Sequence, residues 1–243
     1  MVIDNITKFL KYAVIPLLLG FPVAIIAYRL ELWSMGTSFQ IIKLTGFISM
    51  AVLLIAILVA IFALVKKQKD LAKTCAVVAV LVALPVVGLS MQAAKAKSLP
   101  FIHQVSTDTV DLPKFKVIVA LRGENSNPLD YDSEKLAPLQ QAAYPQLQTI
   151  VSELNVDAAF AKAVDVTNDL GWEIVAQNKD SGMIEAVDTT LLWAFKDDVA
   201  IRVQMTDSGS KIDLRSISRV GMSDLGANAA RITKFITAFK LKD

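Results

Sequence analysis

Three long stretches without charged residues, all in the N-terminal part, constrain this 243-residue chain more than any other feature of its sequence. They contain about 17, 22 and 21 residues, against the roughly 20 that a helix needs to cross a hydrocarbon core. In lipid only helices and closed barrels satisfy the backbone, so these stretches predict helices. The expected transmembrane helices cover about residues 12–28, 45–65 and 74–93, within an anchor of residues 1–97.

The first stretch is the least certain of the three spans, because it is short and contains Pro16 and Pro22. Lys8 and Lys11 precede it, as basic residues precede the apolar core of a signal peptide. No clear cleavage site of small residues follows. Retention as a membrane span is therefore favoured, and removal as a signal peptide stays the alternative.

The positions of the basic residues predict the sidedness of the chain. The link KKQKDLAK between the second and third stretches is rich in lysine, and such links stay in the cytoplasm. The N-terminus is then cytoplasmic, and the part after the third helix lies on the periplasmic or extracellular side of the inner membrane. Lys95 and Lys97 oppose this orientation, so the bias is modest.

No charged residue lies deep in a predicted span, whereas ion and proton pathways usually contain one. The helices are therefore predicted to be an anchor, with the lipid bilayer as their partner. The rest of the chain carries a mild excess of acidic residues. This excludes the cationic surface that nucleic-acid binding requires.

Residues 98–243 are predicted to form a soluble α+β domain. Apolar residues recur at helical spacing from Val156 to Leu170, and Gly171 can cap that helix. Strands, two of them joined by the turn NKDSG, and a closing helix from Ser223 or Asp224 to Phe239 follow. The simplest packing is a four-stranded antiparallel meander with both helices on one face. The expected strands cover residues 172–177, 183–189, 199–205 and 211–217.

The segment before the first of these helices is harder to interpret. Pro100 and Pro113 interrupt a polar stretch that is typical of extended or looping chain. The run KVIVAL predicts a short strand. The stretch GENSNPLDYDSEKLAP predicts a second loop.

Few residues in the sequence suit catalysis or metal binding. His103 is the only histidine, so any histidine-based acid–base chemistry must use it, although an ordinary surface histidine is the simpler interpretation. Cys75, the only cysteine, is expected to be a small buried apolar residue. Asp130, Asp132 and Glu134 resemble the start of a calcium loop, but Lys135 replaces the required glycine. An exposed acidic loop is expected instead, and neither a metal nor a cofactor is predicted.

The charged residues of the last strands form the candidate site. The alternation of side chains places Arg202, Asp213 and Arg215 on one face of the sheet, where Glu185 can join them. One interpretation is a cross-strand lattice of ion pairs. The other is a polar groove for an anionic or polar ligand near the start of the last helix, where Asp224 equally suits a capping role. The candidate ligand-binding residues are Arg202, Asp213, Arg215, Ser216, Ser218, Arg219, Asp224, Asn228 and Arg231.

Two neighbouring aspartates are excluded as a catalytic pair. Asp197 and Asp198 are adjacent in a predicted strand, so their side chains point to opposite faces. They cannot share a proton or a substrate.

The same stretches resemble a known family. The segments GWEIVAQNKDSGMIEAVDTT, FKDDVAIRV and GSKIDLRSISRVGMSDLGANAARI are similar to the bacterial domain-of-unknown-function 1499 family (DUF1499). The pattern RSxSRxGxxDxGxNxxRI, from Arg215 to Ile232, is specific to it. The resemblance covers most of the chain from Pro100 to Phe239. It implies a location in the cell envelope and no established activity.

Three functions are compatible with these features. The leading hypothesis is a non-enzymatic, membrane-anchored envelope domain that binds a polar ligand or an envelope protein, lipid or glycan. The second is a hydrolase or transferase acting on lipid or cell-wall material, using Ser216 or Ser218 with Asp213 and an arginine, although no activating base is evident. The third is a structural subunit of a membrane complex.

Overall fold

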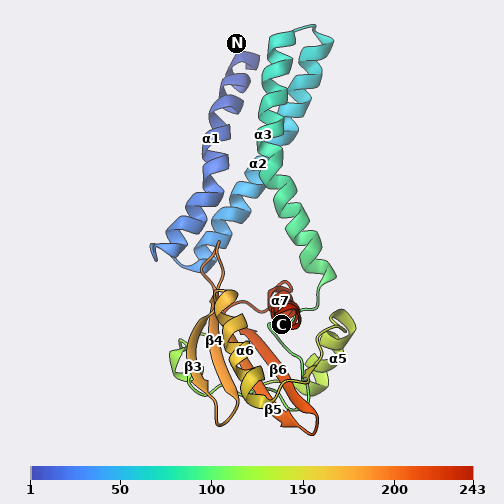
Figure 1. The fold of residues 1–243 in the computed structure, drawn as a ribbon. Coiled ribbons are helices and arrows are strands. Elements are labelled where there is room, and N and C mark those ends of the chain that lie inside the picture. Colours follow the sequence, from blue (N-terminus) through green and yellow to red (C-terminus); the bar gives the residue numbers. More distant parts are fainter. Residues whose placement is uncertain (1, 243) are drawn as a thin grey trace. The chain divides into compact units, whose positions relative to one another are not determined.

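The computed structural model describes residues 2–242, which form two compact units divided between Ala96 and Lys97. The first unit consists of three helices and the second contains an antiparallel sheet with helices (Figure 1). The expected α+β class with three long apolar N-terminal helices is confirmed.

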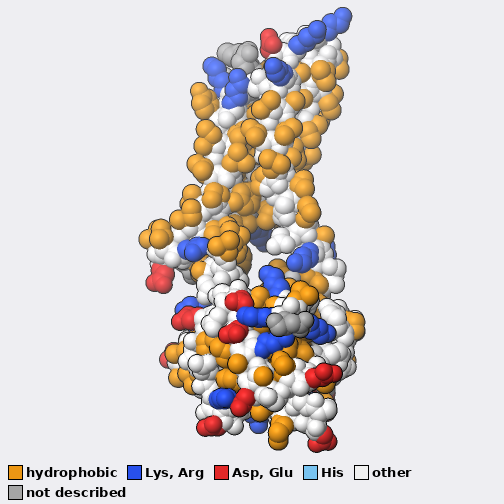
Figure 2. All heavy atoms as spheres, viewed as in Figure 1, with side chains coloured by type: hydrophobic (Ala, Val, Ile, Leu, Met, Phe, Trp, Pro, Cys, Tyr) orange, Lys and Arg blue, Asp and Glu red, His pale blue; other side chains and the backbone are white. Residues whose placement is uncertain are grey.

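The three N-terminal helices are long and apolar enough to cross a membrane, and they indicate a multi-pass membrane protein. They are α1 (Val2–Arg29), α2 (Met35–Val65) and α3 (Lys69–Ser98). Each extends beyond the apolar stretch that predicted it, because a helix continues through polar residues until a cap ends it. Ser34 provides such a cap for α2 by accepting a hydrogen bond from the N–H of Thr37. On the face that Figure 2 shows, hydrophobic side chains cover the outside of these helices.

Small and polar residues allow α1 and α2 to approach closely. A side chain at Gly20 would meet the hydroxyl of Thr45 at 2.7 Å. The Ser38 hydroxyl donates to the carbonyl of Ala24, 2.8 Å away, and accepts from the indole of Trp33. Such contacts are typical of helix pairs in lipid. Further along, α3 joins the apolar core of the bundle, where Cys75 is fully buried as expected.

The second unit is built on a six-stranded sheet in the order β1-β6-β5-β4-β3, with β2 also pairing with β6. The four strands β3 to β6 form the predicted meander, and their hairpins are confirmed. β1 and β2 were not predicted, because each has only three residues and both lie in the irregular segment before the meander. The strands are β1 (Gln104–Ser106), β2 (Ile150–Ser152), β3 (Glu173–Asn178), β4 (Met183–Thr189), β5 (Lys196–Thr206) and β6 (Gly209–Ser218).

Two amphipathic helices, α6 (Val156–Asp169) and α7 (Ala227–Leu241), pack on one face of the sheet. Their apolar faces and the inward residues of β4, β5 and β6 form the main core, in which Trp172, Phe235 and Phe239 stack. Both helices were predicted, and Gly171 ends α6 with a φ of 74° as expected. α7 begins at Ala227, three residues after the predicted start at Asp224.

The opposite face of the sheet is also covered, by a helix that was not predicted. The run KVIVAL is not a strand: α4 (Ile118–Leu121) is a short helix within it, and it packs over this face. Its first turn is fixed by the carboxylate of Glu185, which accepts hydrogen bonds from the N–H groups of residues 116, 117 and 118. A carboxylate stabilises the free N–H groups at the start of a helix. The Glu185 side chain on the sheet therefore favours a helix in a segment whose sequence is typical of a strand.

The stretch expected to be a second loop contains the helix α5 (Ser133–Ala143). The acidic residues there are exposed as expected, but Asp132 caps the helix and accepts the N–H of Lys135. At the other end of α5, the Gln140 amide pairs with both the N–H and the C=O of Ser106 in β1. The fully buried Gln140 amide therefore pairs with the outer edge of β1 as the backbone of a further strand would.

Candidate functional site

The nine candidate residues do not form one groove, because the strands direct them to both faces of the sheet. Ser216 and Ser218 point toward α7, whereas Asp213 and Arg215 point to the face that α4 covers. The structure places eight of the candidates in three clusters, and the ninth, Asp224, holds the start of α7. The expected grouping of a serine with Asp213 is wrong, because the sheet separates them.

The first cluster, the helix-side cluster, lies beneath the start of α7 and consists of Ser216, Ser218, Asn228, Arg231, Asp188 and Asp197. The Arg231 guanidinium donates to Asp188 at 2.7 Å and to Asp197 at 2.5 Å. The Ser216 hydroxyl donates to Asn228 at 2.7 Å and accepts from Arg231 at 3.1 Å. Burial raises the pKa of Asp197 even though Arg231 opposes the shift. Both serine hydroxyls are engaged in this buried network, and neither is hydrogen-bonded to the His103 ring.

Asp224 holds the start of α7. Its carboxylate accepts from the N–H groups of Gly226 and Asn228, at 2.9 and 3.0 Å. The expected capping role of Asp224 is therefore confirmed, although Asp224 precedes the first residue of α7.

The second cluster, the aspartate cluster, surrounds Arg202 on the opposite face. Arg202 forms ion pairs with Asp108, Asp111 and Asp213, at 3.3, 2.7 and 3.2 Å. The Arg202–Asp213 pair joins directly opposed residues of β5 and β6, as the lattice interpretation expected. Asp213 also accepts hydrogen bonds from Thr107 and Thr149.

The third cluster, the arginine cluster, consists of Arg122, Arg215, Arg219 and Asp198. Asp198 is fully buried, and one of its oxygens accepts from both Nε and Nη2 of Arg219, at 2.9 and 2.7 Å. Its other oxygen accepts from Arg122. Asp197, its neighbour, binds Arg231 on the far side of the sheet, so the two aspartates are separated as expected.

Arg215 differs from the other buried arginines in its surroundings. Its side chain contacts Gln104 Oε1 at 2.7 Å and the carbonyl of Leu129, and its Cζ lies 5.2 Å from the ring centre of Phe115. Among residues 2–242 it forms no ion pair, and its buried Nε, like that of Arg202, has no hydrogen-bond partner. Burial lowers the pKa of Arg215 to about 10, and nearby Arg122 adds to the shift. The group still carries its charge at neutral pH.

The segment that contains all three clusters also matches a family model. Residues 104–239, more than half of the chain, match the family described as Protein of unknown function (DUF1499). The chain belongs to the DUF1499 family. The match begins with the first residue of β1 and ends in α7, so the DUF1499 domain comprises the sheet and its helices but none of the candidate membrane helices. No curated protein matches the chain.

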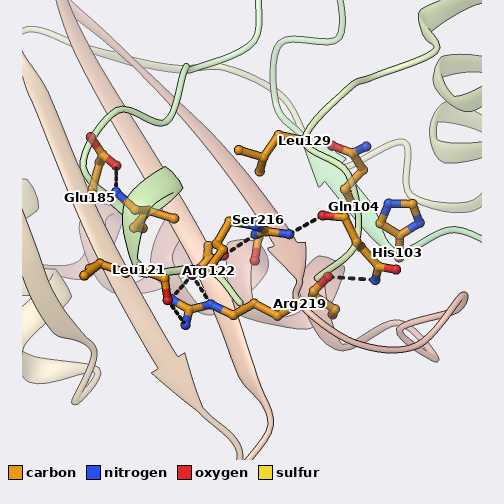
Figure 3. Close-up of polar contacts among 12 residues, drawn as sticks. His103, Gln104, Leu121, Arg122, Leu129, Glu185, Ser216 and Arg219 are labelled. Carbon is orange, nitrogen blue, oxygen red and sulfur yellow. Dashed lines mark hydrogen bonds and ion pairs between the residues drawn. The ribbon is translucent and has the colours of Figure 1, made fainter. Parts of the chain in front are cut away.

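His103 of the DUF1499 domain is only partly exposed, contrary to the expected surface position. Its carbonyl accepts hydrogen bonds from the N–H of Ser218 and the side chain of Asn228, so its backbone joins β6 to α7. Its ring Nε2 is buried without a partner, and burial lowers the pKa of the imidazole. Figure 3 shows the ring beside Gln104, on the segment that leads into β1.

Several partners of the arginine cluster were missed in the sequence. Arg122, Asn127 and Leu129 lie in the segment between α4 and α5, which the sequence identified only as a loop. Asn127 donates from its side-chain amide to the carbonyls of Ser218 and Gly221, at 2.8 and 2.7 Å. The dipeptide Asn127–Pro128 in this segment also resembles the DUF1499 family, and it was the only signal in the sequence. Among the described residues, no group of three or more metal-binding side chains is present.

Proposed function

We propose that this DUF1499 protein is a membrane-anchored binding protein whose ligand carries an anionic group, held at the arginine cluster. One observation supports this most strongly: the cluster holds three arginines but one carboxylate, which pairs with Arg122 and Arg219 only, and Arg215 has a buried Nε without a hydrogen-bond partner. Guanidinium groups bind phosphate and carboxylate through paired, charge-assisted hydrogen bonds. A second anion would offset the excess positive charge.

The surroundings of the cluster favour an anion. Burial lowers the pKa of Arg122 as well as that of Arg215, which reflects the cost of holding cations away from water. An attraction between charges is stronger there than in bulk solvent. An anionic group that completes the cluster would therefore be bound more tightly than at the exposed lysines of the domain.

The cluster reaches the surface at one edge. Arg219 Nη1 donates to the carbonyl of Leu121 at 3.0 Å, and this bond is exposed (Figure 3). The bond from Asn127 to Gly221 is exposed as well. We place the ligand at this edge, where it would replace the Leu121 carbonyl as the acceptor for Arg219 and reach toward Arg215. The anionic group can belong to a free solute, a lipid headgroup or an envelope glycan.

We further propose that the helices hold the domain on the periplasmic or extracellular side of the inner membrane, with the N-terminus in the cytoplasm. The lysine-rich link between α2 and α3 supports this sidedness. Protease added to intact spheroplasts should then remove the domain. Protection of the domain until the membrane is lysed would reverse the assignment.

Binding is tested with the full chain purified in a neutral detergent. Thermal unfolding is followed at pH 7.5 with inorganic phosphate or with sodium chloride of matched ionic strength. A ligand that binds only the folded state raises the melting temperature, and the rise grows with the logarithm of its concentration above the Kd. The parallel arm compares nanodiscs of phosphatidylcholine with nanodiscs containing phosphatidylglycerol.

Two variants separate site binding from general charge effects. Arg215→Met removes the unpaired guanidinium, and Lys234→Met removes one positive charge from an exposed position on α7. We expect phosphate, phosphatidylglycerol or both to stabilise the wild type and Lys234→Met but not Arg215→Met. Stabilisation by phosphate identifies a soluble ligand class, and stabilisation by phosphatidylglycerol alone identifies a headgroup. Equal shifts in all three proteins, or no shift with either anion, would overturn the proposal.

A further inference from the structure

We propose that one end of the DUF1499 sheet lies on the lipid bilayer, with the loop between β4 and β5 inserted among the headgroups. Large apolar side chains with high solvent exposure gather at this end. Leu191 is 91% exposed, Leu192 59%, Phe101 67% and Met222 72%. Exposed apolar groups of this size on a soluble domain mark an interaction surface.

The strand register places these residues at one end of the sheet. Gln104, the first residue of β1, lies opposite Ile217 near the end of β6. Ile217 lies opposite Asp198 at the start of β5, and Lys196 follows the β4–β5 loop. The segment leading into β1, the β4–β5 loop and the segment after β6 therefore leave the sheet together. Figure 1 shows the β4–β5 loop projecting from this end.

The same end carries the tether, which identifies the bilayer as the occupant. The candidate membrane helix α3 ends at Ser98, and β1 begins at Gln104. The five residues between them span at most about 18 Å when fully extended. Chain connectivity therefore keeps this end of the sheet within reach of the membrane surface, whatever the orientation of the helices.

The β4–β5 loop is held in a fixed shape that suits insertion. The N–H of Thr190 donates to the carbonyl of Phe195 at 2.8 Å, and the Thr190 hydroxyl accepts the N–H of Phe195 at 2.9 Å. The rings of Trp193 and Phe195 stack with centres 5.5 Å apart. Aromatic side chains favour the membrane–water interface, and exposed Lys196 beside them suits anionic headgroups.

The proposal is tested in the full chain, reconstituted in phosphatidylcholine nanodiscs. In a Cys75→Ser background, Leu192→Cys carries an environment-sensitive fluorophore, and nitroxide groups are placed at a shallow position on the lipids. Met205→Cys is the matched control, because Met205 is 77% exposed but lies at the opposite end of β5. Both labelled proteins must keep the wild-type melting temperature, which is expected because both side chains are exposed.

We expect the fluorophore at position 192 to shift to shorter wavelength and to be quenched several-fold more strongly than the fluorophore at position 205. Equal quenching at the two positions would overturn the proposal. A blue shift at position 192 without quenching by lipid would also overturn it, because contact with protein would then explain the apolar environment. The result does not depend on the proposed anion site, since the lipid is zwitterionic and Arg215→Met should leave the quenching unchanged.

Discussion

Two clusters on the same face of the sheet are both built from arginine–carboxylate ion pairs. One of them has an excess of carboxylates and the other an excess of guanidinium groups. The aspartate cluster places three carboxylates around Arg202, and one of them, on Asp111, is 68% exposed and can be hydrated. In the arginine cluster the fully buried Asp198 pairs with Arg122 and Arg219, and Arg215 is left without an ion pair among the described residues. Excess charge near solvent is stabilised by water, whereas buried excess charge requires a counter-ion. The difference is the reason for our proposal that the arginine cluster binds a ligand whereas the aspartate cluster is structural.

The largest expected effect comes from removing Asp198. Asp198→Asn leaves Arg122 and Arg219 buried without a counter-charge, which should lower the free energy of unfolding by about 3–5 kcal/mol. Urea unfolding of the full chain in detergent, followed by tryptophan fluorescence, measures the loss. Lys179→Met is the control, because its ion pair with Asp157 is exposed and contributes about 0–1 kcal/mol. Equal stability of the two variants would show that Asp198 does not hold the cluster together.

Arg202→Met should have the next largest effect, because it leaves Asp213 buried without a cation. We expect a loss of about 2–4 kcal/mol, smaller than for Asp198 because two threonine hydroxyls still donate to Asp213. Adding Asp213→Asn should recover part of the loss, and the double-mutant cycle measures this coupling. Additive losses would contradict the pairing.

Arg215→Met should cost less than Arg202→Met, about 1 kcal/mol, because no carboxylate is left behind. Only the Gln104 side chain and the Leu129 carbonyl lose a donor. The same urea titration compares the two variants. A loss from Arg215→Met as large as that from Arg202→Met would show that Arg215 is a structural cation, and the contrast between the clusters would fail.

The smallest expected effect is the pH dependence that His103 contributes. Burial lowers its pKa below the ordinary value of about 6.5, so the unfolded chain binds more protons in the interval just below that pH. Stability should therefore fall when the pH decreases from 7 through this interval. Melting temperatures of the wild type and His103→Gln at pH 7 and 5.5 test this. The raised pKa of Asp197 makes stability rise as the pH decreases, but it does so equally in both proteins. The difference between their pH responses therefore reports the contribution of His103 alone. An equal pH response of the wild type and His103→Gln would contradict a lowered pKa of His103.

The elements with strong periodicity could be predicted from the sequence, and those set by distant contacts could not. The three apolar helices, the meander, α6 and α7 follow from hydrophobic patterns and turns within each segment. The strands β1 and β2 are too short to show a pattern and form only because β6 offers them a free edge. α4 is helical because Glu185, more than sixty residues away, accepts its first N–H groups.

The sequence predicted which strands carry the candidate residues, but it predicted neither the arrangement of these residues nor all of their partners. Strand alternation correctly placed Arg202, Asp213 and Arg215 on one face. It could not show that Arg122 and Asn127 would come from an irregular segment to complete the arginine cluster, because no local pattern fixes the path of a loop. Ser216 and Ser218 were assigned to the same groove as the arginines, although their own alternation with Arg215 directs them to the opposite side.

The most direct test locates an anion in the protein. Crystals of the full chain soaked in sodium selenate, a tetrahedral dianion with an anomalous signal, would reveal where such a group binds. The account predicts an anomalous peak at the exposed edge of the arginine cluster, with oxygens about 3 Å from Arg215 Nε and from Arg219. Selenate peaks elsewhere, with none beside Arg215, would contradict the claim that this cluster is a binding site.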